Sequence, residues 1–220
     1  MKICRYDAIV FDMDGLLLDT ERLAIEAWIE VSRQAGYDIP LAVMLNTLGL
    51  DEHATGRVIH DYAGPEFPYE SLKTAKRALM RKRMIDEGMP KKPGADELLV
   101  ALREAGVPVA LATSTDRERA LWRITRCGWA EYFTALTFGD EVERGKPAPD
   151  IFELAARRMG VRPQSCAALE DSPGGLAAAR AAGMTAILIP DMKAPDDALR
   201  RVAHYVFDDL NTAARHIFTD

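Results

Sequence analysis

Two aspartates placed two residues apart, Asp12 and Asp14, are the side chains of this chain best suited to chemistry. They follow the apolar run Ala8-Ile9-Val10 and precede Gly15, a pattern typical of a buried parallel strand that ends in a turn. Neighbouring carboxylates repel each other, so one of them tends to hold a proton unless a cation lies nearby. Oxygen ligands that include one or two carboxylates suit Mg²⁺. The pair alone is equally compatible with a solvated turn.

Polar groups also follow three later apolar runs, and these are Thr113-Ser114-Thr115, Gly145-Lys146-Pro147 and Glu170-Asp171-Ser172. Taken singly, they are typical of a helix cap, a solvated lysine and a turn. Gly145-Lys146 is not a P-loop, because Pro147 stands where that motif requires Ser or Thr. Parallel strands present their C-terminal ends at one edge of a sheet, so all four groups should converge there. Carboxylates, hydroxyls and a positioned lysine together suit phosphoryl transfer.

The pattern of elements explains why these groups should meet. Short apolar runs predict strands at residues 8–10, 107–112, 135–138, 166–169, 185–189 and 205–207. Helical patterns lie between them at residues 116–127, 150–159 and 176–182. Alternating strands and helices predict an α/β fold with a doubly wound parallel sheet.

A helical stretch interrupts this alternation after the first strand. Its helices are expected from Thr20 to near Gly36, at 41–48, from a capping Asp51 to Ala63, and from Tyr69 to Glu87. Residues 89–94 are expected to form a stiff connection. The simplest organisation is an α/β core domain of residues 1–18 and 89–220 that carries an inserted all-α domain at residues 19–88.

The composition excludes several classes of protein. The chain is 48% hydrophobic and 28% charged, which is typical of a globular protein, and its net charge of −6 argues against a general nucleic-acid binder. No stretch approaches the roughly 20 apolar residues of a membrane span, and no secretory signal is expected. Three widely spaced cysteines without a CxxC motif favour neither a zinc site nor disulfides. The expected location is the reducing cytoplasm.

The motifs together resemble the haloacid dehalogenase superfamily, in its phosphatase and β-phosphoglucomutase-like branch. The resemblance rests on Asp12-Met13-Asp14-Gly15, the hydroxyl turn at Thr113, the Gly145-Lys146-Pro147 loop with Pro149-Asp150, and Glu170-Asp171-Ser172. It covers nearly the whole length of the chain. It implies a Rossmann-like core, and the helical insertion stands where this branch carries its cap domain.

The resemblance implies a role for each matching residue. Asp12 is expected to attack phosphorus and form an aspartyl-phosphate, and Asp14 to serve as general acid and base. Thr113 and Lys146 are expected to hold the phosphoryl oxygens, together with backbone N–H groups of Met13, Asp14 and Ser114. The implied Mg²⁺ ligands are Asp12, Asp171 and the carbonyl of Asp14, with Glu170 acting from behind or through a water.

The resemblance leaves alternatives of different classes open. A β-phosphoglucomutase-like mutase usually carries a histidine where Ala24 stands and a basic residue in the loop that here contains an acid, which favours the phosphatase. An acid at Asp14 favours phosphate chemistry over dehalogenation, because a leaving alkoxide needs a proton. A binding protein that has lost turnover is disfavoured, since every required position is present.

The insertion contributes weaker candidates for recognising the leaving group, which are Arg77, Glu52 and His53. Arg77 belongs to a basic helical stretch, and most of that stretch is expected to be a solvated face. The expected partner is a small phosphorylated metabolite such as a sugar phosphate or phosphoglycolate, with no nucleic acid and no membrane. A monomer is sufficient for this function.

Overall fold

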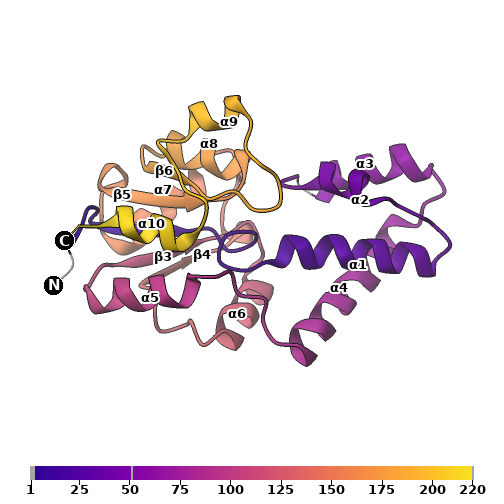
Figure 1. Ribbon diagram of the computed structural model, residues 1–220, viewed down its shortest axis with the longest axis horizontal. Helices are drawn as coiled ribbons and strands as arrows, with labels where there is room; N and C mark the ends of the chain where they lie inside the picture. The colour runs from indigo at the N-terminus through magenta and orange to yellow at the C-terminus, as the bar shows by residue number, and fades with distance from the viewer. Residues whose placement is uncertain (1–2, 51, 220) are drawn as a thin grey trace. The chain divides into compact units, whose positions relative to one another are not determined.

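The computed structural model describes residues 3–50 and 52–219, and the side chain of Glu52 lies outside the described residues (Figure 1). The chain divides into two compact units, one made of Met1–Leu18 with Lys91–Asp220 and the other of Asp19–Pro90. The first unit is of the α/β type and the second is helical. Among the described residues, no helix has the length and apolar character needed to cross a membrane.

Within its described residues, the α/β unit contains a six-stranded sheet in the order β4-β3-β2-β5-β6-β7, and every pairing is parallel. The strands are β2 (Ala8–Phe11), β3 (Val109–Ala112), β4 (Ala135–Thr137), β5 (Cys166–Glu170), β6 (Thr185–Leu188) and β7 (Tyr205–Val206). A separate antiparallel ribbon pairs β1 (Ile3–Cys4) with β8 (Phe218–Thr219). All residues of β2, β3 and β5 are buried, which is why their sequences read as unbroken apolar runs.

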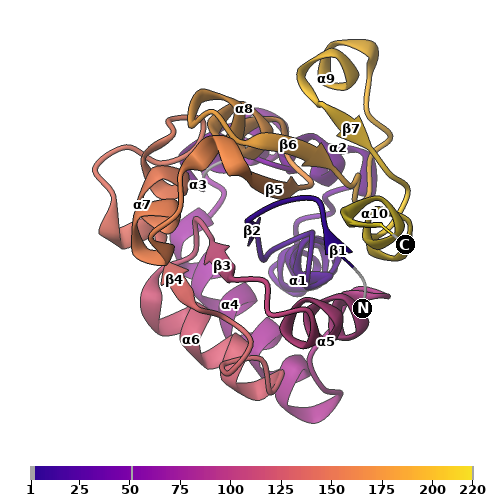
Figure 2. The ribbon, with the colours of Figure 1, turned by 90° about the vertical axis from the view of Figure 1, so that its left-hand side faces the viewer.

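Helices cover both faces of the sheet, as Figure 2 shows along the strands. Helices α5 (Ala95–Glu104) and α6 (Arg117–Arg126) lie on one face, and α7 (Asp150–Met159) and α8 (Pro173–Ala181) lie on the other. Alternate residues of the strands, such as Val10, Ala110 and Ala168, pack against α7 and α8 to form one apolar core. The prediction of a doubly wound parallel sheet is confirmed.

Several short elements were not predicted from the sequence. They are α5, η2 (Gly139–Glu141), η3 (Pro163–Ser165), α9 (Asp197–Val202), α10 (Leu210–Ile217) and the β1–β8 ribbon. Helices of ten residues or fewer are marginal on their own and form because tertiary packing stabilises them. Helix α8 also begins three residues earlier than expected, because the Ser172 hydroxyl accepts the Gly175 N–H and Pro173 occupies the first turn.

The helical unit consists of α1 (Thr20–Gln34), α2 (Leu41–Met44), η1 (Leu45–Thr47), α3 (Glu52–Ala63) and α4 (Tyr69–Asp86). Helices α1 and α4 pack against each other, and the rings of Trp28 and Tyr69 stack with their centroids 5.2 Å apart. Arg83 of α4 adds ion pairs to Glu26 and Glu30 of α1. The expected capping residue, Asp51, lies outside the described residues.

Candidate active site

Three adjacent strands of the sheet bring most of the predicted site residues to one edge. Asp12 follows β2, Thr113 follows β3, and Glu170 and Asp171 stand at the end of β5. Strand β2 lies between β3 and β5 in the sheet, and the backbone N–H of Asp12 donates to the carbonyl of Leu169 (3.1 Å). The parallel arrangement therefore places these groups together, as the sequence predicts.

Lys146 joins the site from the loop that precedes α7. Its ammonium donates to Asp12 Oδ1 (2.5 Å), to Glu170 Oε1 (2.6 Å) and to the carbonyl of Ala112 (2.9 Å). All three of its hydrogens are thus directed to acceptors at the ends of β2, β3 and β5. The side chains of Lys146 and Asp12 are 7% and 9% exposed, and Glu170 is fully buried. A buried ion-pair network of this kind holds its members in one geometry.

The pKa values of both Asp12 and Lys146 are raised, by burial in the first case and by neighbouring carboxylates in the second. Burial raises the pKa of Asp12 to about 8 although Lys146 opposes the shift, and Glu170 adds to it. Burial acts to lower the pKa of Lys146, but the carboxylates of Asp12 and Glu170 outweigh it and raise that pKa. Lys146 is therefore positively charged at neutral pH, while burial disfavours the charged form of Asp12.

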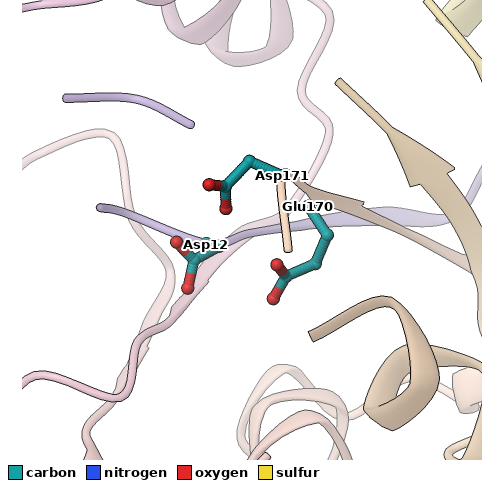
Figure 3. A group of neighbouring side chains, drawn as sticks. All are labelled: Asp12, Glu170 and Asp171. Atoms are coloured by element: carbon teal, nitrogen blue, oxygen red, sulfur yellow. The ribbon is translucent and has the colours of Figure 1, made fainter. Parts of the chain in front are cut away.

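A cluster of three carboxylates surrounds the same point. One ligand oxygen from each of Asp12, Glu170 and Asp171 lies within 4.8 Å of the others. Figure 3 shows the three side chains gathered at the ends of β2 and β5. An oxygen-only donor set and a buried carboxylate with a raised pKa both fit a divalent cation such as Mg²⁺.

Asp14 has a different environment from Asp12. Its Oδ2 accepts the hydroxyl of Thr115 (2.7 Å), and its Oδ1 forms an ion pair with Arg123. Arg123 lies on α6 and was not predicted as a site residue. A signal existed, since Arg123 stands between Ala120 and Ile124 on the face of α6 that is otherwise apolar and buried.

The remaining predicted core residues lie around these networks. Thr113 is buried, and its hydroxyl accepts the backbone N–H of Thr115 (3.1 Å). Met13 is fully buried, and Ser114 is exposed at the start of the hydroxyl turn. The Ser114 carbonyl approaches Gly139 so closely that a Cβ there would lie 2.2 Å from its oxygen.

The candidates in the helical unit form no comparable cluster among the described residues. Arg77 is half-buried on α4, and the exposed His53 contacts Arg57 one turn further along α3. The side chain of Glu52 lies outside the described residues. Their participation in substrate recognition stays a prediction.

We expect Gly175→Ala to disturb the site while the neighbouring Gly174→Ala does not. A Cβ at Gly175 would lie 2.0–2.1 Å from the Glu170 carboxyl group, whereas nothing lies within 4 Å of one at Gly174. Displacing the buried Glu170 should lower the free energy of unfolding by about 1–3 kcal/mol. Chemical denaturation of both variants checks this. Equal behaviour of the two variants would show that Glu170 tolerates displacement.

Comparison with known proteins agrees with the fold. A family model of haloacid dehalogenase-like hydrolases matches residues 6–183. The phosphorylated carbohydrates phosphatase of Thermotoga maritima is 33% identical over 183 residues, covering 82% of this chain and 83% of that protein. The fructose-1-phosphate phosphatase YqaB of Escherichia coli is 36% identical over 185 residues, covering 83% and 96%.

A solved structure extends the similarity to the architecture. The crystal structure of a haloacid dehalogenase family hydrolase from Deinococcus radiodurans, with bound phosphate and sodium, matches with a TM-score of 0.78 and 31% identity. The match covers 95% of this chain and 93% of that one. The chain belongs to the haloacid dehalogenase-like hydrolase family, in its phosphatase branch. The prediction of a phosphoric monoester hydrolase is confirmed at this level.

Proposed function

We propose that this protein is a Mg²⁺-dependent phosphatase that hydrolyses a small phosphorylated metabolite through an aspartyl-phosphate intermediate. The observation that carries the proposal is the buried network in which Lys146 binds both Asp12 and Glu170 beside the carboxylate of Asp171. This network combines a restrained nucleophile, a cation for phosphoryl oxygens and the donors of a metal site. These are the requirements of phosphoryl transfer, in which positioning and charge neutralisation supply most of the catalysis.

In the first step, an Asp12 oxygen forms a bond to phosphorus while the bond from phosphorus to the leaving oxygen breaks. The Thr113 hydroxyl and the backbone N–H groups of Met13, Asp14 and Ser114 donate to the phosphoryl oxygens, and Lys146 places its positive charge beside them. Lys146 also restricts the rotation of Asp12, so the nucleophile is oriented before substrate binds.

Asp14 moves the protons. It gives a proton to the leaving alkoxide oxygen in the first step. In the second step it takes a proton from water as the water oxygen attacks the aspartyl-phosphate, which releases inorganic phosphate and regenerates Asp12. Its contact with the Thr115 hydroxyl keeps the carboxyl group at the same edge of the sheet as Asp12.

The residues that would hold Mg²⁺ are Asp12, Asp171 and the carbonyl of Asp14, with Glu170 supporting them from behind or through a water. When bound, the ion supplies positive charge that offsets the negative charge of the phosphoryl group and of the carboxylates. Gly15 adopts φ = 91°, and a Cβ there would lie 2.1 Å from Asp171 Oδ2. The absence of a side chain at Gly15 therefore leaves room for the Asp171 carboxylate.

The relatives and the division of the chain into two units support a proposal about the substrate class. Two relatives are named for a phosphorylated carbohydrate and for fructose 1-phosphate, which supports a sugar phosphate or a similarly small substrate such as phosphoglycolate. We propose that the helical unit is the cap and supplies the residues that recognise the leaving group, with Arg77, His53 and Glu52 as candidates. Free cysteines at positions 4, 127 and 166 support a location in the reducing cytoplasm.

Phosphate release from a panel of sugar phosphates, phosphoglycolate and nucleotides tests the proposal, measured with Mg²⁺ and with chelator. We expect metal-dependent release that is strongest for one small phosphorylated metabolite. Metal binding by the chain is measured separately, by calorimetry on the parent and on Asp171→Asn, and should weaken in the variant.

The panel also distinguishes the alternative function, a β-phosphoglucomutase-like mutase. A mutase would release no phosphate and would isomerise a hexose 1-phosphate once a sugar bisphosphate is added. Release that is unaffected by chelator would contradict the metal-dependent mechanism.

A further inference from the structure

The α/β unit also contains a largely buried ion pair between Arg123 and Asp14, the residue two positions after Asp12 of the network around Lys146. Arg123, on α6, is 8% exposed, and its guanidinium pairs with Asp14 Oδ1. The other oxygen of Asp14 accepts the Thr115 hydroxyl at 2.7 Å. Both oxygens of the carboxyl group are thus held by residues of the same unit, from two separate segments of the chain.

Forming this ion pair is energetically unfavourable for the helix, which indicates that Arg123 has a specific role. Burying an arginine costs free energy of desolvation, and a hydrophobic residue between Ala120 and Ile124 would complete the apolar face of α6 without that cost. Asp14 itself is half-buried at the active-site edge. The buried charge of Arg123 therefore pairs with the carboxyl group to which the proposed function assigns proton transfer.

Arg123 is suited to orient this group. Its planar guanidinium binds a carboxylate in a defined direction, and the helix fixes the position of its stem. Thr115 follows β3 directly and is tied to the sheet by the bond from its N–H to the Thr113 hydroxyl. With one oxygen bound on each side, the Asp14 carboxyl group has little freedom to rotate about its side-chain torsions.

We propose that Arg123 is a positioning residue that acts through Asp14 and that, together with Thr115, sets the direction in which Asp14 exchanges its proton. Arg123 contacts no reacting atom in this role. The proposal rests on the proposed function, because it requires Asp14 to protonate the leaving alkoxide and to deprotonate the attacking water. General acid catalysis of this kind contributes about 10²–10⁴-fold to a rate.

The test compares two leaving groups in single-turnover reactions. Transfer of the phosphoryl group from a sugar phosphate to Asp12 needs a proton on the departing alkoxide, whereas 4-nitrophenolate leaves 4-nitrophenyl phosphate without one. We expect Arg123→Gln to slow transfer from the sugar phosphate by about 100-fold. The burst of nitrophenolate should keep its rate, and its steady-state release should slow because Asp14 also activates water.

Further variants separate positioning from damage to the fold. Arg123→Lys keeps the charge and should recover part of the rate, and Thr115→Val should show the same leaving-group dependence with a smaller loss. Arg126→Gln, on the same helix, removes an exposed arginine that lies over the Trp122 ring and should change neither reaction. Thermal unfolding of each variant checks that it is folded.

The decisive measurement is a double-mutant cycle with Asp14→Asn. If Arg123 acts through Asp14, then Arg123→Gln adds no further loss in the Asp14→Asn background. Two results would overturn the proposal. One is that the losses caused by Arg123→Gln and Asp14→Asn multiply in the double variant, and the other is that Arg123→Gln slows the nitrophenolate burst as much as it slows transfer from the sugar phosphate. If Asp14→Asn alone leaves transfer from the sugar phosphate unchanged, the proton-transfer role in the proposed function fails, and the role of Arg123 fails with it.

Discussion

Replacing Asp12 by asparagine should abolish phosphate release, with a loss on the order of 10⁶-fold, the size seen when a covalent nucleophile is removed. The amide has nearly the same shape as the carboxyl group but does not attack phosphorus. Lys146 keeps its bonds to Glu170 and to the Ala112 carbonyl, so the local structure should survive. Phosphate release with saturating Mg²⁺ measures the loss, and circular dichroism checks the fold.

The same substitution should stabilise the metal-free protein at alkaline pH. Burial raises the pKa of Asp12 from its ordinary value of 3.8 to about 8. Between these values the unfolded chain releases this proton while the folded chain keeps it, so the free energy of unfolding falls as pH rises. The Asp12→Asn variant has no carboxyl group to titrate, so its free energy of unfolding does not fall in this way. The difference in free energy of unfolding between the variant and the parent should therefore grow from about pH 4 to pH 8.

Denaturation of both proteins in chelator across this pH range measures the effect. Mg²⁺ should reduce the difference, because a bound cation compensates the parent's negative charge. Retained turnover in Asp12→Asn would disprove the nucleophilic role. A variant that is less stable than the parent at every pH in chelator would contradict the account of the buried charge.

Replacing Lys146 by methionine should destabilise the metal-free protein by about 3–5 kcal/mol and reduce turnover strongly. Methionine fills a similar volume but leaves the buried carboxyl groups of Asp12 and Glu170 without the cation that now binds both. Removing one partner of a buried ion pair costs more than removing all of its charges together. Chemical denaturation with and without Mg²⁺ measures the change.

Two further variants distinguish a loss of charge compensation in Lys146→Met from a loss of packing. Adding Glu170→Gln to Lys146→Met removes one of the uncompensated charges and should recover much of the stability but not the activity. Lys82→Met, in the exposed pair between Lys82 and Asp86 of α4, should leave stability unchanged. If the double variant is as unstable as the single one, the loss comes from packing rather than from charge.

The sequence was sufficient for the architecture of the sheet and for predicting that most of the candidate core residues lie at one edge of it. Strands such as Ala8–Phe11 and Cys166–Glu170 are buried on both sides, so they appear as short apolar runs whose length favours strands over helices. Helix α7 has the predicted bounds because Pro149 precedes it and Gly160 ends it in a left-handed conformation. Parallel strands then bring Asp12, Thr113 and Asp171 to one edge without further information.

Tertiary structure decided which groups are paired and which weak elements form. Helices α5 and α10 are short and obtain much of their stability from the packing of their buried faces, although the Asp209 cap of α10 was a local signal in the sequence. Lys146 reaches both Asp12 and Glu170 only because its loop folds over the ends of β2 and β5.

Arg123 shows most clearly the difference between what the sequence predicts and what tertiary packing decides. Helical periodicity places this arginine on the buried face of α6, but it says nothing about the group that lies opposite. That group, Asp14, is 109 residues away in the sequence, and the packing of α6 against the sheet brings the two together. Local patterns thus determine which face of an element is buried, while the contacts across that face depend on how the elements pack, since packing brings together groups far apart in the chain.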